Sequence, residues 1–108
     1  MKGRSMSVRI AAPLWARIRD YHCSPGKCRE ALSYLYGRVE VVDGGLVLLL
    51  PEHAPYFAFA EDCFESRSGL HVRLRPEVLN GMLLDFAGSD YNCLINIHDH
   101  WFAEDAVF

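Results

Sequence analysis

The stretch VEVVDGGLVLLL, residues 39–50, is the part of the chain that decides the fold class. Its valines and leucines lie on both sides of an Asp-Gly pair, a pattern that predicts a β-hairpin closed by a tight turn. The apolar run at 46–50 is far too short to cross a bilayer. It is expected to form the second strand of the hairpin. A β-sheet is therefore predicted for this protein.

A strand and two helices are predicted before the hairpin. Residues 8–10 form a short predicted strand, and Pro13 suits the first turn of a helix, where its missing N–H would be unpaired in any case. Three residues share one face of this helix: Leu14, Ile18 and Tyr21. A second helix is predicted over 27–36, because apolar residues recur there at helical spacing and Gly37 follows as a helix end.

Strands and one further helix are predicted after the hairpin. Residues 56–60 and 70–74 alternate between apolar and other side chains and predict strands, whereas the polar residues 61–68 predict a loop. A helix is predicted to open at 75–77, and the apolar run within 91–97 predicts a central strand that is buried on both faces. The residues of this helix expected to face inward are Val78, Met82, Leu83 and Phe86. The order strand, two helices, four strands, helix, strand predicts an α+β fold of mixed α/β layers.

Composition limits the class of protein. The 108 residues suit one domain, expected over 8–108 after a flexible leader over 1–7, and 51% hydrophobic content excludes intrinsic disorder. The net charge of −3, with 14 acids against 11 bases, argues against a nucleic-acid partner. No apolar run follows the basic residues Lys2 and Arg4, so no signal peptide is expected, and we predict a cytoplasmic protein without a membrane partner.

The cysteines form no Cys-x-x-Cys pair: they are Cys23, Cys28, Cys63 and Cys93. Without a secretory signal they are expected to be reduced and mostly buried. A zinc knuckle built from His22, Cys23 and Cys28 is conceivable, but the spacing matches no strong template.

His98-Asp99-His100, directly after the predicted last strand, is the sharpest candidate site. Residues two apart in an extended chain point to the same side, so both imidazoles would project together, and zinc binds such nitrogen ligands. The acidic pair Glu104-Asp105 behind them could complete a metal shell or be an exposed tail. Glu30, considered alone, is a typical solvated charge.

Two of these motifs together resemble a known family. The stretch EALSYLYG, residues 30–37, is followed by valine strands, and His98-x-His100 ends a later strand. This arrangement resembles the JAMM (JAB1/MPN/Mov34) metalloprotease domain, most closely its short bacterial branch. The family pattern is Glu-x-x-Gly-x-Leu-x-Gly, then much later His-x-His, about seven residues, and Ser-x-x-Asp. The resemblance spans roughly 8–107 and implies a β-sheet flanked by helices, of the JAMM/cytidine-deaminase-like kind.

The resemblance also implies a function. It makes His98 and His100 ligands of a zinc ion, and Glu30 the general base that takes a proton from the metal-bound water. The activity that it implies is hydrolysis of an amide or isopeptide bond. The implied partners are a protein or peptide substrate, such as a ubiquitin-like protein, and a ThiF-like activating protein.

This chain departs from the family pattern at three places. Ser33 replaces a glycine, Trp101 replaces the proline after the second histidine, and the sequence ends at Phe108, before the Ser-x-x-Asp motif. One explanation, which we favour, is that the domain lacks its C-terminal part; the exposed apolar edge would then favour a homodimer. The other is that Asp105, Asp99 or an acid from a second copy supplies the third ligand.

Two further functional interpretations stay open. The chain could be a non-catalytic, MPN-type interaction module that keeps the scaffold without the metal. It could also be an α+β domain whose histidines have no special role.

Overall fold

The computed structural model describes residues 5–23, 31–59, 61–67 and 72–99. Within these ranges the elements follow one another as β1 (Met6–Ile10), α1 (Ala12–His22), β2 (Leu32–Val42), β3 (Gly45–Leu50), β4 (Tyr56–Ala58), η1 (Glu61–Cys63), β5 (Phe64–Arg67), β6 (Val72–Leu74), α2 (Pro76–Ala87) and β7 (Cys93–His98). Strands and helices are mixed, which confirms the α+β class. Neither helix in the described ranges is both long and apolar enough to span a membrane. β1 begins at Met6, so Met6 and Ser7 belong to the sheet and not to the predicted flexible leader.

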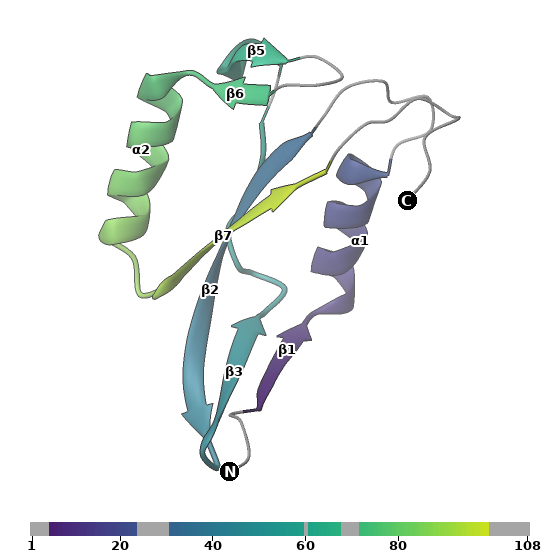
Figure 1. The fold of residues 1–108 in the computed structure, drawn as a ribbon, viewed down its shortest axis with the longest axis vertical. Coiled ribbons are helices and arrows are strands. Elements are labelled where there is room, and N and C mark those ends of the chain that lie inside the picture. The colour runs from purple at the N-terminus through teal and green to yellow at the C-terminus, as the bar shows by residue number, and fades with distance from the viewer. Residues whose placement is uncertain (1–4, 24–30, 60, 68–71, 100–108) are drawn as a thin grey trace.

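The main sheet has five strands (Figure 1). Its path is β1-β3-β2-β4, with β1 parallel to β3 and the other pairs antiparallel, and β7 pairs with β2 in addition. α1 and α2 lie on opposite sides of this sheet in the view of Figure 1. β5 and β6 form a separate two-stranded sheet.

The predicted hairpin is confirmed. β2 and β3 pair antiparallel, from Val42 opposite Gly45 to Arg38 opposite Leu49. Asp43 and Gly44 occupy the turn with φ of 51° and 79°. Two successive positive φ angles are what a type I′ turn needs, and Asp-Gly tolerates them because glycine has no Cβ and aspartate is short and polar.

The predicted second helix is wrong for residues 32–36, which are the first half of strand β2; residues 27–30 lie outside the described part of the chain. This half of β2 is buried from both sides: Ser33 and Leu35 face α1, while Tyr36 faces α2. A strand that is buried on both faces shows no polar-apolar alternation, so its pattern can be mistaken for a helical one.

The central strand of the sheet is β2, and the prediction that residues 91–97 would form it is wrong. Among the described strands β7 pairs with β2 alone, and its Asn96 and His98 are exposed. The polar stretch predicted as a loop over 61–68 contains η1 and strand β5. β5 pairs with β6 through backbone groups, a pairing that does not depend on apolar side chains, and the pair at one end, Phe64 opposite Leu74, is buried.

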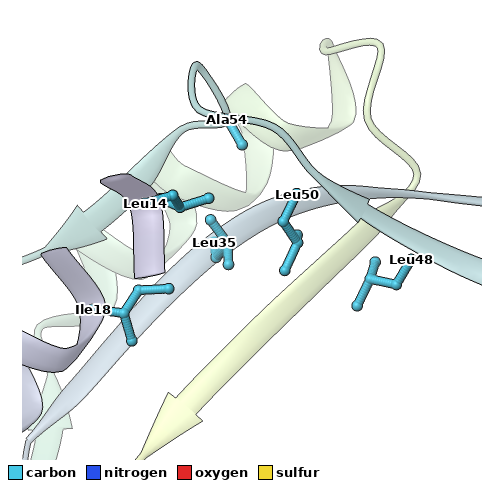
Figure 2. Close-up of a cluster of buried hydrophobic side chains, with 6 residues drawn as sticks. All are labelled: Leu14, Ile18, Leu35, Leu48, Leu50 and Ala54. Atoms are coloured by element: carbon cyan, nitrogen blue, oxygen red, sulfur yellow. The ribbon is translucent and has the colours of Figure 1, made fainter. Parts of the chain in front are cut away.

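The core lies between α1 and the sheet (Figure 2). The predicted first helix is confirmed: Leu14 and Ile18 of α1 are 0% and 4% exposed. The other members of this buried cluster are Leu35, Leu48, Leu50 and Ala54. Each leucine that is fully buried in this way contributes roughly 1.5–3 kcal/mol relative to an exposed one.

α2 covers the opposite face of the sheet. The hydroxyl of Tyr36 in β2 lies 2.9 Å from the carbonyl oxygen of Met82 and 2.9 Å from Oδ2 of Asp85, and both can accept its proton. Met82 is buried as predicted, but Leu83 is 41% exposed, so the inward stripe of this helix is narrower than expected.

Candidate functional site

The candidate site lies where strand β7 ends beside the start of β2. The last pair of these strands is His98 opposite Leu32. Beyond it, the backbone N–H of Asp99 donates to the carbonyl oxygen of Ala31 at 3.1 Å. The backbone N–H of Ala31 donates in return to Oδ1 of Asp99 at 3.2 Å. Two segments 68 positions apart are thus held together by two hydrogen bonds.

His22 joins helix α1 to this strand end. It follows Leu14 and Ile18 at intervals of four residues, on the face of α1 that packs against the sheet, and it is 8% exposed. Its Nδ1 lies 2.5 Å from Oδ2 of Asp99, and its Nε2 lies 2.6 Å from Oγ of Ser33. We call His22, Ala31, Ser33 and Asp99 the strand-end network.

The proton positions in the network follow from its donors and acceptors. The carboxylate of Asp99 can only accept, so Nδ1 of His22 carries a proton and donates it. In the neutral imidazole Nε2 is then an acceptor, and the hydroxyl of Ser33 donates to it. The two buried polar side chains, His22 and Ser33, therefore have partners, which is the usual condition for burying them at low cost, and the partly exposed Asp99 supplies one of these partners.

The connectivity from serine to histidine to aspartate is that of a hydrolase triad, but the burial excludes that role. Ser33 is 0% exposed and lies beneath α1, so its hydroxyl is out of reach of a substrate. A nucleophile must come within bonding distance of the reacting atom. The strand-end network is therefore a structural element that fastens α1, β2 and the end of β7 to one another.

The predicted zinc ligands are only partly within the described residues. His98 is exposed at the end of β7, whereas Glu30, His100 and Asp105 lie outside the described ranges. Ile97, which precedes His98, packs on the core beneath α1, so His98 projects from the other side of the strand. An exposed imidazole at a strand end is suited to binding a metal from solvent, since neutral imidazole is a common zinc ligand.

Two alternative ligand assignments do not agree with the geometry. Asp99, considered as a third zinc ligand, directs its carboxylate to His22 and to the N–H of Ala31, on the α1 side of the sheet. The zinc knuckle of His22, Cys23 and Cys28 finds no support either, because both ring nitrogens of His22 have hydrogen-bond partners; Cys28 lies outside the described residues. Cys23 is exposed, contrary to the expectation of mostly buried thiols.

No group of three or more His, Cys, Asp or Glu side chains arranged to hold a metal occurs in the described part of the chain. An open recess of about 1370 Å³ does occur, and it is lined by residues such as Ile10, Arg38, His53 and Tyr91. Neither His98 nor any member of the strand-end network lines it. Among the described residues, the recess is therefore separate from His98 and from the strand-end network.

Sequence reasoning did not find the strand-end network. The available signal was the placement of His22 on the buried stripe of an amphipathic helix, because a buried histidine needs partners for both nitrogens. Nothing local to Ser33 or Asp99 indicated that these residues would be those partners.

Comparison of the chain with protein-family models, with curated proteins and with solved structures finds no match.

Proposed function

We propose that this chain is a zinc-dependent metallopeptidase or isopeptidase domain that resembles the JAMM family, with His98 and His100 as metal ligands and Glu30 as general base. The observation that carries the proposal is the pair of hydrogen bonds between Ala31 and Asp99. Ala31 is bonded covalently to Glu30, and Asp99 separates the two histidines. The pairing thus joins the chain beside the proposed base to the chain that carries the proposed ligands.

The direction of the side chains also supports the proposal. Asp99 points to the α1 side of the sheet and His98 to the other, as neighbours in an extended chain do. His100 lies outside the described residues, and its place two positions after His98 is the basis for proposing it as the second ligand. Two imidazoles spaced in this way can share one zinc ion.

The proposed residues divide the chemistry between them. Bound zinc would lower the pKa of a water to about 7 and polarise the amide carbonyl. The carboxylate of Glu30 would accept a proton from the attacking water and deliver it to the nitrogen of the leaving amine, which would otherwise leave as an unstable anion. We propose Asp105 or an acid from a second copy as the third ligand, because Asp99 is already engaged with His22.

The substrate class that we propose is an amide or isopeptide bond in a protein or peptide, such as the carboxyl-terminal linkage of a ubiquitin-like protein. A ThiF-like activating protein is the proposed partner. The second candidate function is a non-catalytic, MPN-type interaction module. The inward orientation of Asp99 favours this candidate, since it removes one acidic side chain from the possible ligands.

The zinc content of the purified chain after dialysis against a weak chelator tests the proposal. We expect about one zinc per chain, lost in His98→Ala and kept in His53→Ala, which changes an exposed histidine of the separate recess. Glu30→Gln is expected to keep the zinc and lose hydrolysis of ubiquitin-like fusions. Zinc that survives in His98→Ala would refute the ligand assignment. Absence of zinc in the unchanged chain would favour the interaction module.

A further inference from the structure

We propose that the open recess at the ends of β1 and β3 binds a small organic carboxylate, with two arginines holding the carboxylate group and apolar residues contacting the hydrocarbon part. The recess has a volume of about 1370 Å³, above the usual range of about 300–1000 Å³ for small-molecule sites, so its size admits such a ligand. No lining residue is a proposed zinc ligand or general base, so this inference does not depend on the proposed function.

A row of three side chains crosses the sheet at the recess. Leu49 of β3 is paired with Arg9 of β1 on one side and with Arg38 of β2 on the other. Side chains at directly paired positions stand on the same face of a sheet, so the two arginines flank the leucine. β1, β3 and β2 lie side by side (Figure 1), and two strand spacings separate the Cα atoms of the arginines by about 10 Å. Both long side chains can therefore reach one anion placed over Leu49.

This row stands on the face of the sheet that α2 covers. Leu50 belongs to the core beneath α1, so its neighbour Leu49 points to the other side of β3. Tyr36, two positions before Arg38, contacts α2 through its hydroxyl. Residues 89–91, which follow α2, also line the recess. The sheet and this loop therefore contribute to the same recess from two different elements.

The guanidinium groups are available for a ligand. Arg9 is exposed and has no hydrogen-bond or ion-pair partner among the described residues. Arg38 donates from Nη1 to the backbone carbonyl oxygen of Asp90 at 2.5 Å, and its Nε lies 3.5 Å from Oε1 of Glu40 in a half-exposed ion pair. Such pairs are weak in water, and the contact with Asp90 holds the arginine at the recess without using a carboxylate group.

The recess is positive although the chain as a whole is negative. Its always-charged lining side chains are Arg9 and Arg38 against Asp90, which leaves one net positive charge, whereas the full chain has a formal charge of −3. His53, the other titratable base in the lining, adds positive charge when it is protonated. One net positive charge matches the single negative charge of a carboxylate, whose two oxygens fit the planar guanidinium fork.

Apolar residues define the other half of the ligand. Those that line the recess are Val8, Ile10, Ala11, Leu49, Leu50 and Pro51. Each methylene group that a ligand buries fully against such a surface raises affinity by about fourfold. The recess should therefore prefer a carboxylate that carries a hydrocarbon chain or ring to a small inorganic anion.

Titration of the full 108-residue chain with sodium hexanoate, followed by heteronuclear NMR, tests the proposal. We expect saturable shifts of the amide signals of Leu49, Ser89 and Tyr91, with a millimolar or tighter dissociation constant, and no shift at Gly81 of α2. Hexanamide, which lacks the charge, and acetate, which lacks the chain, should each bind at least about 10-fold more weakly. Phenylpropanoate should compete with hexanoate, and the tighter of the two shows whether the natural acid is aromatic or aliphatic.

Matched variants locate the binding site. Arg9→Gln removes a charge that makes no internal contact, and Arg38→Gln removes the second; each should weaken hexanoate binding about tenfold. Arg19→Gln changes an exposed arginine of α1 that does not line the recess, and it should alter affinity less than about twofold. Unchanged amide signals away from the recess show that each variant is folded.

Four results would overturn the proposal. Shifts that do not saturate by about 50 mM hexanoate would show that no specific site exists. Equal affinity for hexanoate and hexanamide would show that the arginines do not recognise the charge. Equal losses in Arg9→Gln and Arg19→Gln would indicate a general effect of net charge. Inorganic phosphate that binds as tightly as hexanoate would refute the assignment of the ligand as an organic carboxylate.

Discussion

Tyr36→Phe changes one hydroxyl group that is almost completely buried beneath α2. Tyr36 is 1% exposed, and its hydroxyl lies 2.9 Å from both the carbonyl oxygen of Met82 and Oδ2 of Asp85. Three causes together raise the pKa of Tyr36 from 10.0 to about 12: burial is the largest, followed by the hydrogen bond to Asp85 and by the negative charge of Asp85. The substitution should therefore have opposite effects at neutral and at alkaline pH.

At neutral pH the phenylalanine variant should be less stable by about 1 kcal/mol, the usual net value of one hydrogen bond. At alkaline pH the wild type loses an additional contribution. The folded state keeps the Tyr36 proton up to about pH 12, whereas the unfolded chain releases it near pH 10, so stability falls as the pH rises between these values. A difference of two pKa units between the folded and unfolded states lowers the unfolding free energy of the wild type by about 2.7 kcal/mol once the pH is well above 12. By pH 11 the loss is about 1.4 kcal/mol. The stabilities of the two proteins should therefore cross between about pH 10 and pH 11.

Equilibrium urea unfolding, followed by far-UV circular dichroism at several pH values from 7.5 to 11, tests this prediction. Other tyrosines and the lysines are the same in both proteins, so the difference between the unfolding free energies isolates Tyr36. Asp85→Asn removes the negative charge, one of the two smaller causes of the shift, and should flatten the alkaline slope in part. A difference that stays constant within about 0.3 kcal/mol from pH 8 to pH 11 would refute the reasoning.

Two further predictions concern packing, and chemical denaturation measures both. Gly37→Ala should destabilise the fold by about 1–3 kcal/mol, because a Cβ there would lie 2.7 Å from Cδ2 of Leu50. Gly81→Ala in α2, where a Cβ meets nothing within 4 Å, should be neutral or stabilising by up to about 1 kcal/mol, and equal losses at both glycines would contradict the steric argument. Leu14→Ala should lower the free energy of unfolding by about 2–5 kcal/mol. Trp15→Ala changes a side chain that is 51% exposed and should lower it by less than about 1 kcal/mol. The reverse order would show that α1 packs through another face.

The parts of the fold that follow local rules could be predicted from the sequence. The Asp43-Gly44 turn fixes the register of β2 and β3, and the prolines mark the first turns of α1 and α2. The start of β2 could not be predicted by periodicity because its residues are buried against helices on both sides. Its aromatic residues, Tyr34 and Tyr36, were the remaining signal for a strand.

The sequence position of the candidate site could be predicted, but the contacts between its residues in space could not. His98 was expected at the end of a strand and lies there. The partner of that strand was not predictable, because the pairing of β7 with β2 depends on residues that are distant along the chain. The sequence did not indicate whether the carboxylate of Asp99 faces a metal or helix α1; in the structure it contacts His22 of α1 and the N–H of Ala31.

The pairing of Ala31 with Asp99 also has a consequence for the order of folding. The β2–β3 hairpin closes over a two-residue turn, whereas the residues paired between β2 and β7 are 56 to 66 positions apart, from Gly37 with Cys93 to Leu32 with His98, and carry a larger entropic cost of loop closure. We expect the hairpin to form first and the end of β7 to dock last, so that the candidate centre is assembled only when the rest of the sheet exists. Pulse-labelling hydrogen exchange during refolding would then show protection of the β3 amides before that of Asp99. If the proposed metal centre forms at this strand end, a chain interrupted partway through folding would contain the ligand residues without the arrangement that holds the metal.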